Sequence, residues 1–142
     1  MNDKVLNTMT IDECLSKNNV LPALNELLSA ASRSPYAYAK IKKDMENAVY
    51  KYIIRDLGSW KAPCRVRIDY LYGERSKGGL RDYDGISSGA KKIILDALVK
   101  RGVLEDDSPR YLAPPVESYI YTDKPFIKLD FVEAPPFEKK TK

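Results

Sequence analysis

The chain has 142 residues, of which 44% are hydrophobic and 31% are charged, a composition typical of one globular domain and not of a disordered chain. It contains no histidine and only two cysteines, Cys14 and Cys64. These counts exclude Ser-His-Asp and Cys-His catalysis, zinc sites built on imidazole or on four thiolates, and a disulfide framework. Any chemistry must therefore use carboxylates, lysine, tyrosine or a hard metal ion.

The net charge of +4 is distributed unevenly. Residues 32–101 hold 16 lysines and arginines against 8 acidic residues, whereas the remaining residues hold 8 against 12. A basic segment of this kind is what binding to a polyanion requires, although an ordinary solvated surface produces the same pattern. No apolar run approaches the roughly 20 residues that cross a bilayer, and no secretory signal is recognised, so we expect a cytoplasmic protein.

The first third of the chain contains one well-marked element. We expect a strand over residues 8–15, within an N-terminal segment (1–20) of uncertain structure, and then a small, polar stretch up to residue 34. Ser34-Pro35 is a typical helix start, because the hydroxyl caps the first turn and proline fits there. Apolar residues at helical spacing follow, and Gly58 is the predicted end of this helix.

The rest of the chain alternates between strands and a second helix. Apolar and polar residues alternate over 64–72, which predicts a strand, and residues 73–79 are predicted to be a flexible basic turn. An apolar stripe over 86–100 predicts a helix that Gly102 ends. Further on, residues 116–121 and 126–132 are predicted to form a β-hairpin, and residues 134–142 are predicted to be a loose tail. These elements indicate a single α/β domain with a mixed sheet and two principal helices.

Three aspartates around the second helix form a candidate metal site. Asp82 and Asp84 precede the helix, and in an extended chain a D-x-D pair places both carboxylates on one side. Asp107 follows the helix, and the chain after Gly102 is long enough for Asp107 to fold back toward the pair. Such a site would bind Mg²⁺ or Mn²⁺ and position a water for attack on a phosphodiester, with Lys92 as a nearby cation.

Simpler roles for the same residues stay open. Asp82 and Asp84 precede a helix and would suit its N-terminal cap and dipole. Lys92 and Asp96 are one helical turn apart and could simply pair with each other. Asp106 and Asp107 precede Ser108-Pro109 and could be only part of a turn.

The segment from Arg81 to Asp107, RDYDGISSGAKKIILDALVKRGVLEDD, resembles the RusA family of Holliday-junction resolvases. In that family an R-D-x-D element opens a helix that carries a lysine and an Asp-Ala-Leu step, and a glycine-containing turn and paired aspartates follow. Upstream, Leu21–Asn25 and the tract 37–47 are similar to the family's N-terminal loop and first helix. The resemblance therefore covers residues 21–112 and is strongest over 81–107.

The resemblance implies a RusA-like nuclease domain over residues 21–133. Its expected activity is Mg²⁺-dependent hydrolysis of phosphodiesters in four-way DNA junctions, in recombination and repair, by a homodimer of prophage origin. A two-fold axis would relate two active sites and so allow two symmetric nicks.

Carried over by position, Asp82, Asp84 and Asp107 would be the metal-binding catalytic carboxylates. Lys92 would be the catalytic lysine, chosen over Lys91 by counting back from the Asp-Ala-Leu step. The basic residues that we expect to contact DNA are Arg65, Arg67, Arg75, Lys77, Arg81 and Lys91.

This chain departs from the family at two residues and in one spacing. Gly85 stands where asparagine often follows the second aspartate, and Leu95 stands where members can carry an aromatic residue. The stretch between Asp84 and Asp96 is longer than in the shorter members. Two alternatives therefore stay open: a non-catalytic DNA-binding relative, and a nuclease that prefers flaps or replication forks.

Overall fold

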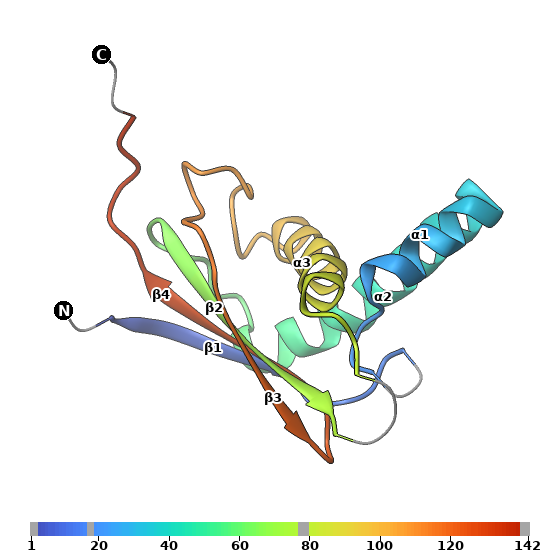
Figure 1. Ribbon diagram of the computed structural model, residues 1–142. Helices are drawn as coiled ribbons and strands as arrows, with labels where there is room; N and C mark the ends of the chain where they lie inside the picture. Colours follow the sequence, from blue (N-terminus) through green and yellow to red (C-terminus); the bar gives the residue numbers. More distant parts are fainter. Residues whose placement is uncertain (1–2, 17–18, 77–79, 140–142) are drawn as a thin grey trace.

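The computed structural model describes residues 3–16, 19–76 and 80–139 (Figure 1). A four-stranded mixed sheet in the order β1-β4-β2-β3 packs against three helices, which confirms the predicted single α/β domain. In Figure 1 the three helices lie on one side of the sheet. The elements in chain order are β1 (Val5–Ile11), α1 (Leu24–Arg33), α2 (Pro35–Leu57), β2 (Val66–Arg75), α3 (Tyr83–Lys100), β3 (Val116–Thr122) and β4 (Phe126–Glu133).

One hydrophobic core joins the sheet to the helices. Along β2, Ile68, Tyr70 and Tyr72 are buried, and these alternate with half-buried residues that face away from the helices. Ile93 and Ile94 of α3 are fully buried in the same cluster. Within the described ranges, no helix is both long and apolar enough to cross a membrane.

The two predicted helices are present with the predicted signals at their ends. The Ser34 hydroxyl accepts a hydrogen bond from the Ala37 amide at 2.9 Å, and α2 stops at Gly58, whose φ of 59° suits glycine. Helix α3 begins three residues earlier than expected, at Tyr83, and it ends before Gly102, whose φ is 77°.

The N-terminal third differs from the prediction. Helix α1 was not predicted, because its ten residues are mostly small and polar and bury only Leu27 and Ala30. The first strand covers 5–11 and not 8–15, and it pairs antiparallel with β4. Residues 5–11, which we expected to lie in a segment of uncertain structure, therefore belong to the domain.

The predicted hairpin of β3 and β4 is wrong. Both strands are neighbours of β2: β3 pairs with it in parallel and β4 pairs with it antiparallel. The chain between them passes the end of β2 at Ser76, whose amide donates to the Thr122 carbonyl at 3.0 Å. The first residue of β4, Phe126, packs against Gly73, where a β-carbon would lie 2.5 Å from its ring. Strand β2 also continues to Arg75, into the stretch predicted as a turn, because residues 69–75 pair with β3.

Candidate functional site

The connection from β2 to α3 is held by Arg81. Its guanidinium donates two hydrogen bonds to the Glu74 carboxylate, both at 2.9 Å, and a third to the Leu21 carbonyl at 3.0 Å. Glu74 is buried, so the pair is a two-pronged ion pair with little access to water. Arg81 was predicted to contact DNA, but in this structure its donors tie the start of α3 to the sheet and to residue 21.

Asp82 and Asp84 occupy the start of α3. Asp82 is the N-cap residue and its carbonyl accepts a hydrogen bond from the Ile86 amide at 3.0 Å, yet its side chain makes no capping hydrogen bond. Asp84 lies in the first turn, and both aspartates are exposed. This end of α3 is the positive end of the helix dipole, which attracts negatively charged side chains. The simpler role of Asp82 as a side-chain cap is therefore not observed.

Both aspartates line one cavity between α1 and α3. The cavity has a volume of about 530 Å³, and Glu26 and Ser88 also border it. The two helices approach closely because Gly89 has no side chain: a β-carbon there would lie 2.4 Å from the Pro22 carbonyl oxygen. Because of this contact, the beginning of α1 lines one side of the cavity and the beginning of α3 lines the other.

The structure separates the two candidate lysines. The Lys91 ammonium lies 3.1 Å from a carboxylate oxygen of Glu117, whereas Lys92 is exposed and has no ion pair within the described ranges. The simpler alternative, a pair of Lys92 with Asp96, is not formed, because Asp96 pairs with Lys42 at 2.5 Å. Lys92 follows Asp84 by two turns of α3, about 12 Å along the axis, so it could contact a phosphate beyond the carboxylates but not the same metal ion.

Asp107 lies beyond the other end of α3. The helix has 18 residues and is therefore about 27 Å long. After it, the chain turns toward the start of β2, where the Ala113 amide donates to the Val66 carbonyl at 2.8 Å and the Tyr111 carbonyl accepts from the Val66 amide. The fold-back of Asp107 onto Asp82 is thus not observed within one chain: the chain is long enough, but its pairing with β2 directs it elsewhere.

No three acidic side chains come together as metal ligands in the part of the chain that the structure describes. Within one chain, the site consists of the exposed Asp82 and Asp84 pair. Mg²⁺ takes oxygen ligands and is commonly bound through one or two carboxylates plus waters and substrate phosphates. The pair therefore fits such an ion, while Asp107 stands apart.

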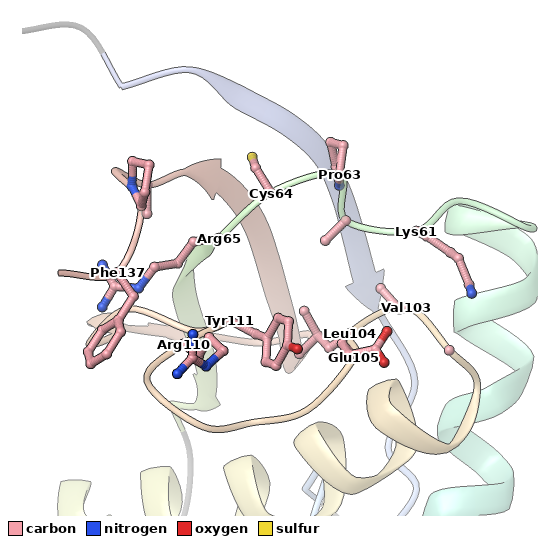
Figure 2. A pocket seen from close by; sticks show the side chains of 14 residues that line it. Lys61, Pro63, Cys64, Arg65, Val103, Leu104, Glu105, Arg110, Tyr111 and Phe137 are labelled. Carbon is pink, nitrogen blue, oxygen red and sulfur yellow. The ribbon is translucent and has the colours of Figure 1, made fainter. Parts of the chain in front are cut away.

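The loop that carries Asp107 borders a second cavity, of about 450 Å³, at the start of β2 (Figure 2). Arg65 spans this region: its guanidinium donates to the Pro109 carbonyl at 2.8 Å and to the Pro135 carbonyl at 3.2 Å, and it lies over the Phe137 ring. The first residues of the predicted loose tail thus pack on the domain. Arg65, a predicted DNA contact, joins two segments of the chain here.

The remaining predicted DNA contacts have different surroundings. Arg67 donates to both carboxylate oxygens of Asp69 and to Asp3, and these hydrogen bonds raise the pKa of the Arg67 guanidinium. Arg75 is exposed at the end of β2, without an ion pair in the described part of the chain. Lys77 lies outside the described residues.

Sequence reasoning missed a stack of tyrosine rings beside Asp82 and Asp84. The ring of Tyr83 packs on that of Tyr119, with centroids 4.3 Å apart. Burial, and then the Glu117 carboxylate, raises the pKa of Tyr119 above its ordinary value. The only signal in the sequence is the recurrence of tyrosine at alternate strand positions, which does not say which strands are neighbours.

The chain matches no protein-family model, and no curated protein sequence matches it. The local resemblance over residues 81–107 and the geometry around Asp82 and Asp84 are therefore what point to a function.

Proposed function

We propose that the protein is a Mg²⁺-dependent endodeoxyribonuclease of the RusA type that cuts four-way DNA junctions. The observation that supports this most directly is the arrangement of Asp82 and Asp84. Both are exposed at the N-terminus of α3 and line one cavity, and the Asp82 side chain makes no capping hydrogen bond. They also stand in the R-D-x-D order of the family, ahead of a lysine and an Asp-Ala-Leu step.

In this proposal the carboxylates of Asp82 and Asp84 would hold the metal ion, and the scissile phosphate would bind beside them. A bound Mg²⁺ would activate a water and offset the charge that develops on the phosphate oxygens. Arg81 acts as a positioning residue, because its ion pair with Glu74 fixes the backbone just before the carboxylates. Lys92 contacts a neighbouring phosphate from the same helix.

Asp107 could join the Asp82 and Asp84 pair only from a second copy of the chain. Each copy carries the Asp82 and Asp84 pair at one end of α3 and Asp107 beyond the other end. In a two-fold dimer, Asp107 of one copy can meet the pair of the other, and symmetry repeats this contact at a second site. Two such shared sites suit the paired nicks that resolve a junction.

The test is to compare single Asp82→Asn, Asp84→Asn and Asp107→Asn variants on four-way, flap, fork and linear DNA, with and without Mg²⁺. We expect each variant to keep junction binding and to lose cleavage by at least about a hundredfold, because a metal ligand is removed. Asp44→Asn is the matched control, since Asp44 is exposed on α2 and pairs only with Lys40 in the described structure.

The outcomes separate the alternatives. Undiminished cutting by all three variants would refute the assignment of the catalytic carboxylates, and no cutting by the parent protein would favour a non-catalytic DNA-binding protein. A parent protein that prefers flaps or forks would indicate a nuclease with a different substrate.

A further inference from the structure

A column of four stacked tyrosines runs from the core to the surface beside the carboxylate pair. The ring centroids are 5.7 Å apart for Tyr70 and Tyr72, 5.0 Å for Tyr72 and Tyr119, and 4.3 Å for Tyr119 and Tyr83. Tyr70 and Tyr72 are buried, whereas Tyr83 at the outer end is 49% exposed. The outermost ring, that of Tyr83, therefore packs on rings that are anchored in the core.

Tyr83 is held firmly on its inner side. Its ring packs nearly parallel to that of Tyr119, with 24° between the planes, and its carbonyl accepts a hydrogen bond from the Tyr119 hydroxyl at 3.3 Å. Tyr121, itself 43% exposed, lies beside it, and the nearby Tyr83 side chain raises the pKa of Tyr121. Because one face of the Tyr83 ring is covered and half of the residue is exposed, the other face is available to a flat ligand.

The position of Tyr83 relates this ring to the proposed metal site. It stands between Asp82 and Asp84 in the sequence, but the three side chains diverge. The two aspartates line the cavity beside α1, whereas Tyr83 packs against β3. The segment 82–84 is therefore a ridge with carboxylates on one side and an aromatic surface on the other. A DNA strand whose phosphate lies at the carboxylates would bring its next base over this ridge.

We infer that the exposed face of Tyr83 is a nucleobase-stacking site, which holds a base of the DNA strand that is bound at Asp82 and Asp84. This inference rests on the proposed function, because it takes the ligand of the carboxylates to be DNA. Stacking on an aromatic ring needs no particular base, so the site positions the strand without reading its sequence. A rigid ring also loses little conformational entropy on binding, since the column already fixes it.

The experiment measures junction binding in Ca²⁺, with 2-aminopurine placed in turn at each nucleotide around the branch point. Stacking of this fluorescent base on tyrosine quenches it. We expect quenching at one position or more with the parent protein and with Tyr83→Phe, and no quenching with Tyr83→Ala or Tyr83→Leu. The last two variants should also bind the junction about tenfold more weakly or worse.

Two controls distinguish stacking from loss of structure. Tyr36→Ala removes a tyrosine that is 77% exposed at the start of α2, and it should change neither quenching nor affinity. Tyr83→Leu keeps an apolar contact with Tyr119 but removes the aromatic face, and a melting temperature close to that of the parent shows that it folds.

The outcomes separate this inference from the proposed function. Unchanged quenching and affinity in Tyr83→Ala, or equal losses in Tyr83→Phe and Tyr83→Ala, overturn the stacking site, and so does a parent protein that binds no DNA. Tyr83-dependent quenching without any metal-dependent cutting supports the stacking site and overturns only the nuclease assignment.

Discussion

The two ends of helix α3 differ in the contacts that surround their acidic residues. At the N-terminal end, Arg81 is clamped to the buried Glu74, Gly89 allows the backbone of residues 22–24 to touch the helix, and two exposed carboxylates share one cavity. At the C-terminal end, Asp107 is exposed on a loop that the start of β2 holds through backbone hydrogen bonds.

In the proposed function, this difference would divide one metal site between two places. At the N-terminal end, the contacts of Arg81 and Gly89 fix the backbone that carries the two exposed carboxylates. The C-terminal end presents Asp107 next to Asp106 on a loop that backbone hydrogen bonds hold, and no three acidic side chains come together there in the described chain. On that proposal, one chain would carry two unequal parts of a metal site, separated by the length of a helix.

The largest expected effect is the recovery of activity when two inactive variants are mixed. If each site takes Asp82 and Asp84 from one copy and Asp107 from the other, a heterodimer of Asp82→Asn and Asp107→Asn contains one intact site. Random mixing should then restore roughly a quarter of the parental nicking rate. Nicking of a labelled junction after co-refolding measures this, and each variant alone is the control. Mixtures as inactive as the separate variants would show that the two ends do not meet across a dimer.

Arg81→Ala should destabilise the fold by about 3 kcal/mol, because it leaves the buried Glu74 carboxylate without its partner. The matched change at the other end, Arg65→Ala, should cost only about 1 kcal/mol, since it removes hydrogen bonds to two carbonyls near the surface and leaves no buried charge. The midpoint of urea unfolding gives both values. If Arg65→Ala costs as much as Arg81→Ala, the C-terminal end is as tightly built as the N-terminal one.

Gly89→Ala should cost about 1–3 kcal/mol, because its β-carbon would meet the backbone of residues 22–24. Gly85→Ala, one turn earlier in the same helix, meets only ordinary contacts at 3.8 Å and beyond, so it should stabilise the helix by up to about 1 kcal/mol. Thermal melting compares the two. If Gly89→Ala instead raises the melting temperature, α1 and α3 can move apart without a loss of stability.

The features that the sequence predicted well are those with local causes. Both ends of α2 and the C-terminal end of α3 follow from Ser34-Pro35, Gly58 and Gly102, because capping and left-handed backbone are properties of a few adjacent residues. The D-x-D pair likewise stays together, since its two aspartates are separated by one residue. These parts of the fold and of the candidate site could be predicted without knowing the tertiary structure.

The features that were missed depend on contacts between distant segments. The short link between β3 and β4 suggested a hairpin, but β4 has partners on both sides, in β1 and in β2. The loop length alone did not determine the direction of Asp107, which depends on pairing with Val66. Arg65 and Arg67 were expected to face DNA because of their charge, yet carbonyls and carboxylates elsewhere in the chain take their donors.

The placement of β4 has a consequence for how the protein is made. The hydroxyl of Thr8 in β1 meets the carboxylate of Asp130 in β4, 122 residues later, and β4 is also the strand that joins β1 to the rest of the sheet. During synthesis, β1 therefore waits without a partner strand until β4 (Phe126–Glu133) has been made. Such long-range pairing slows folding and leaves strand edges open to aggregation. Products truncated before residue 126 should accumulate as insoluble material or be degraded, so that only chains that include β4 reach a folded state.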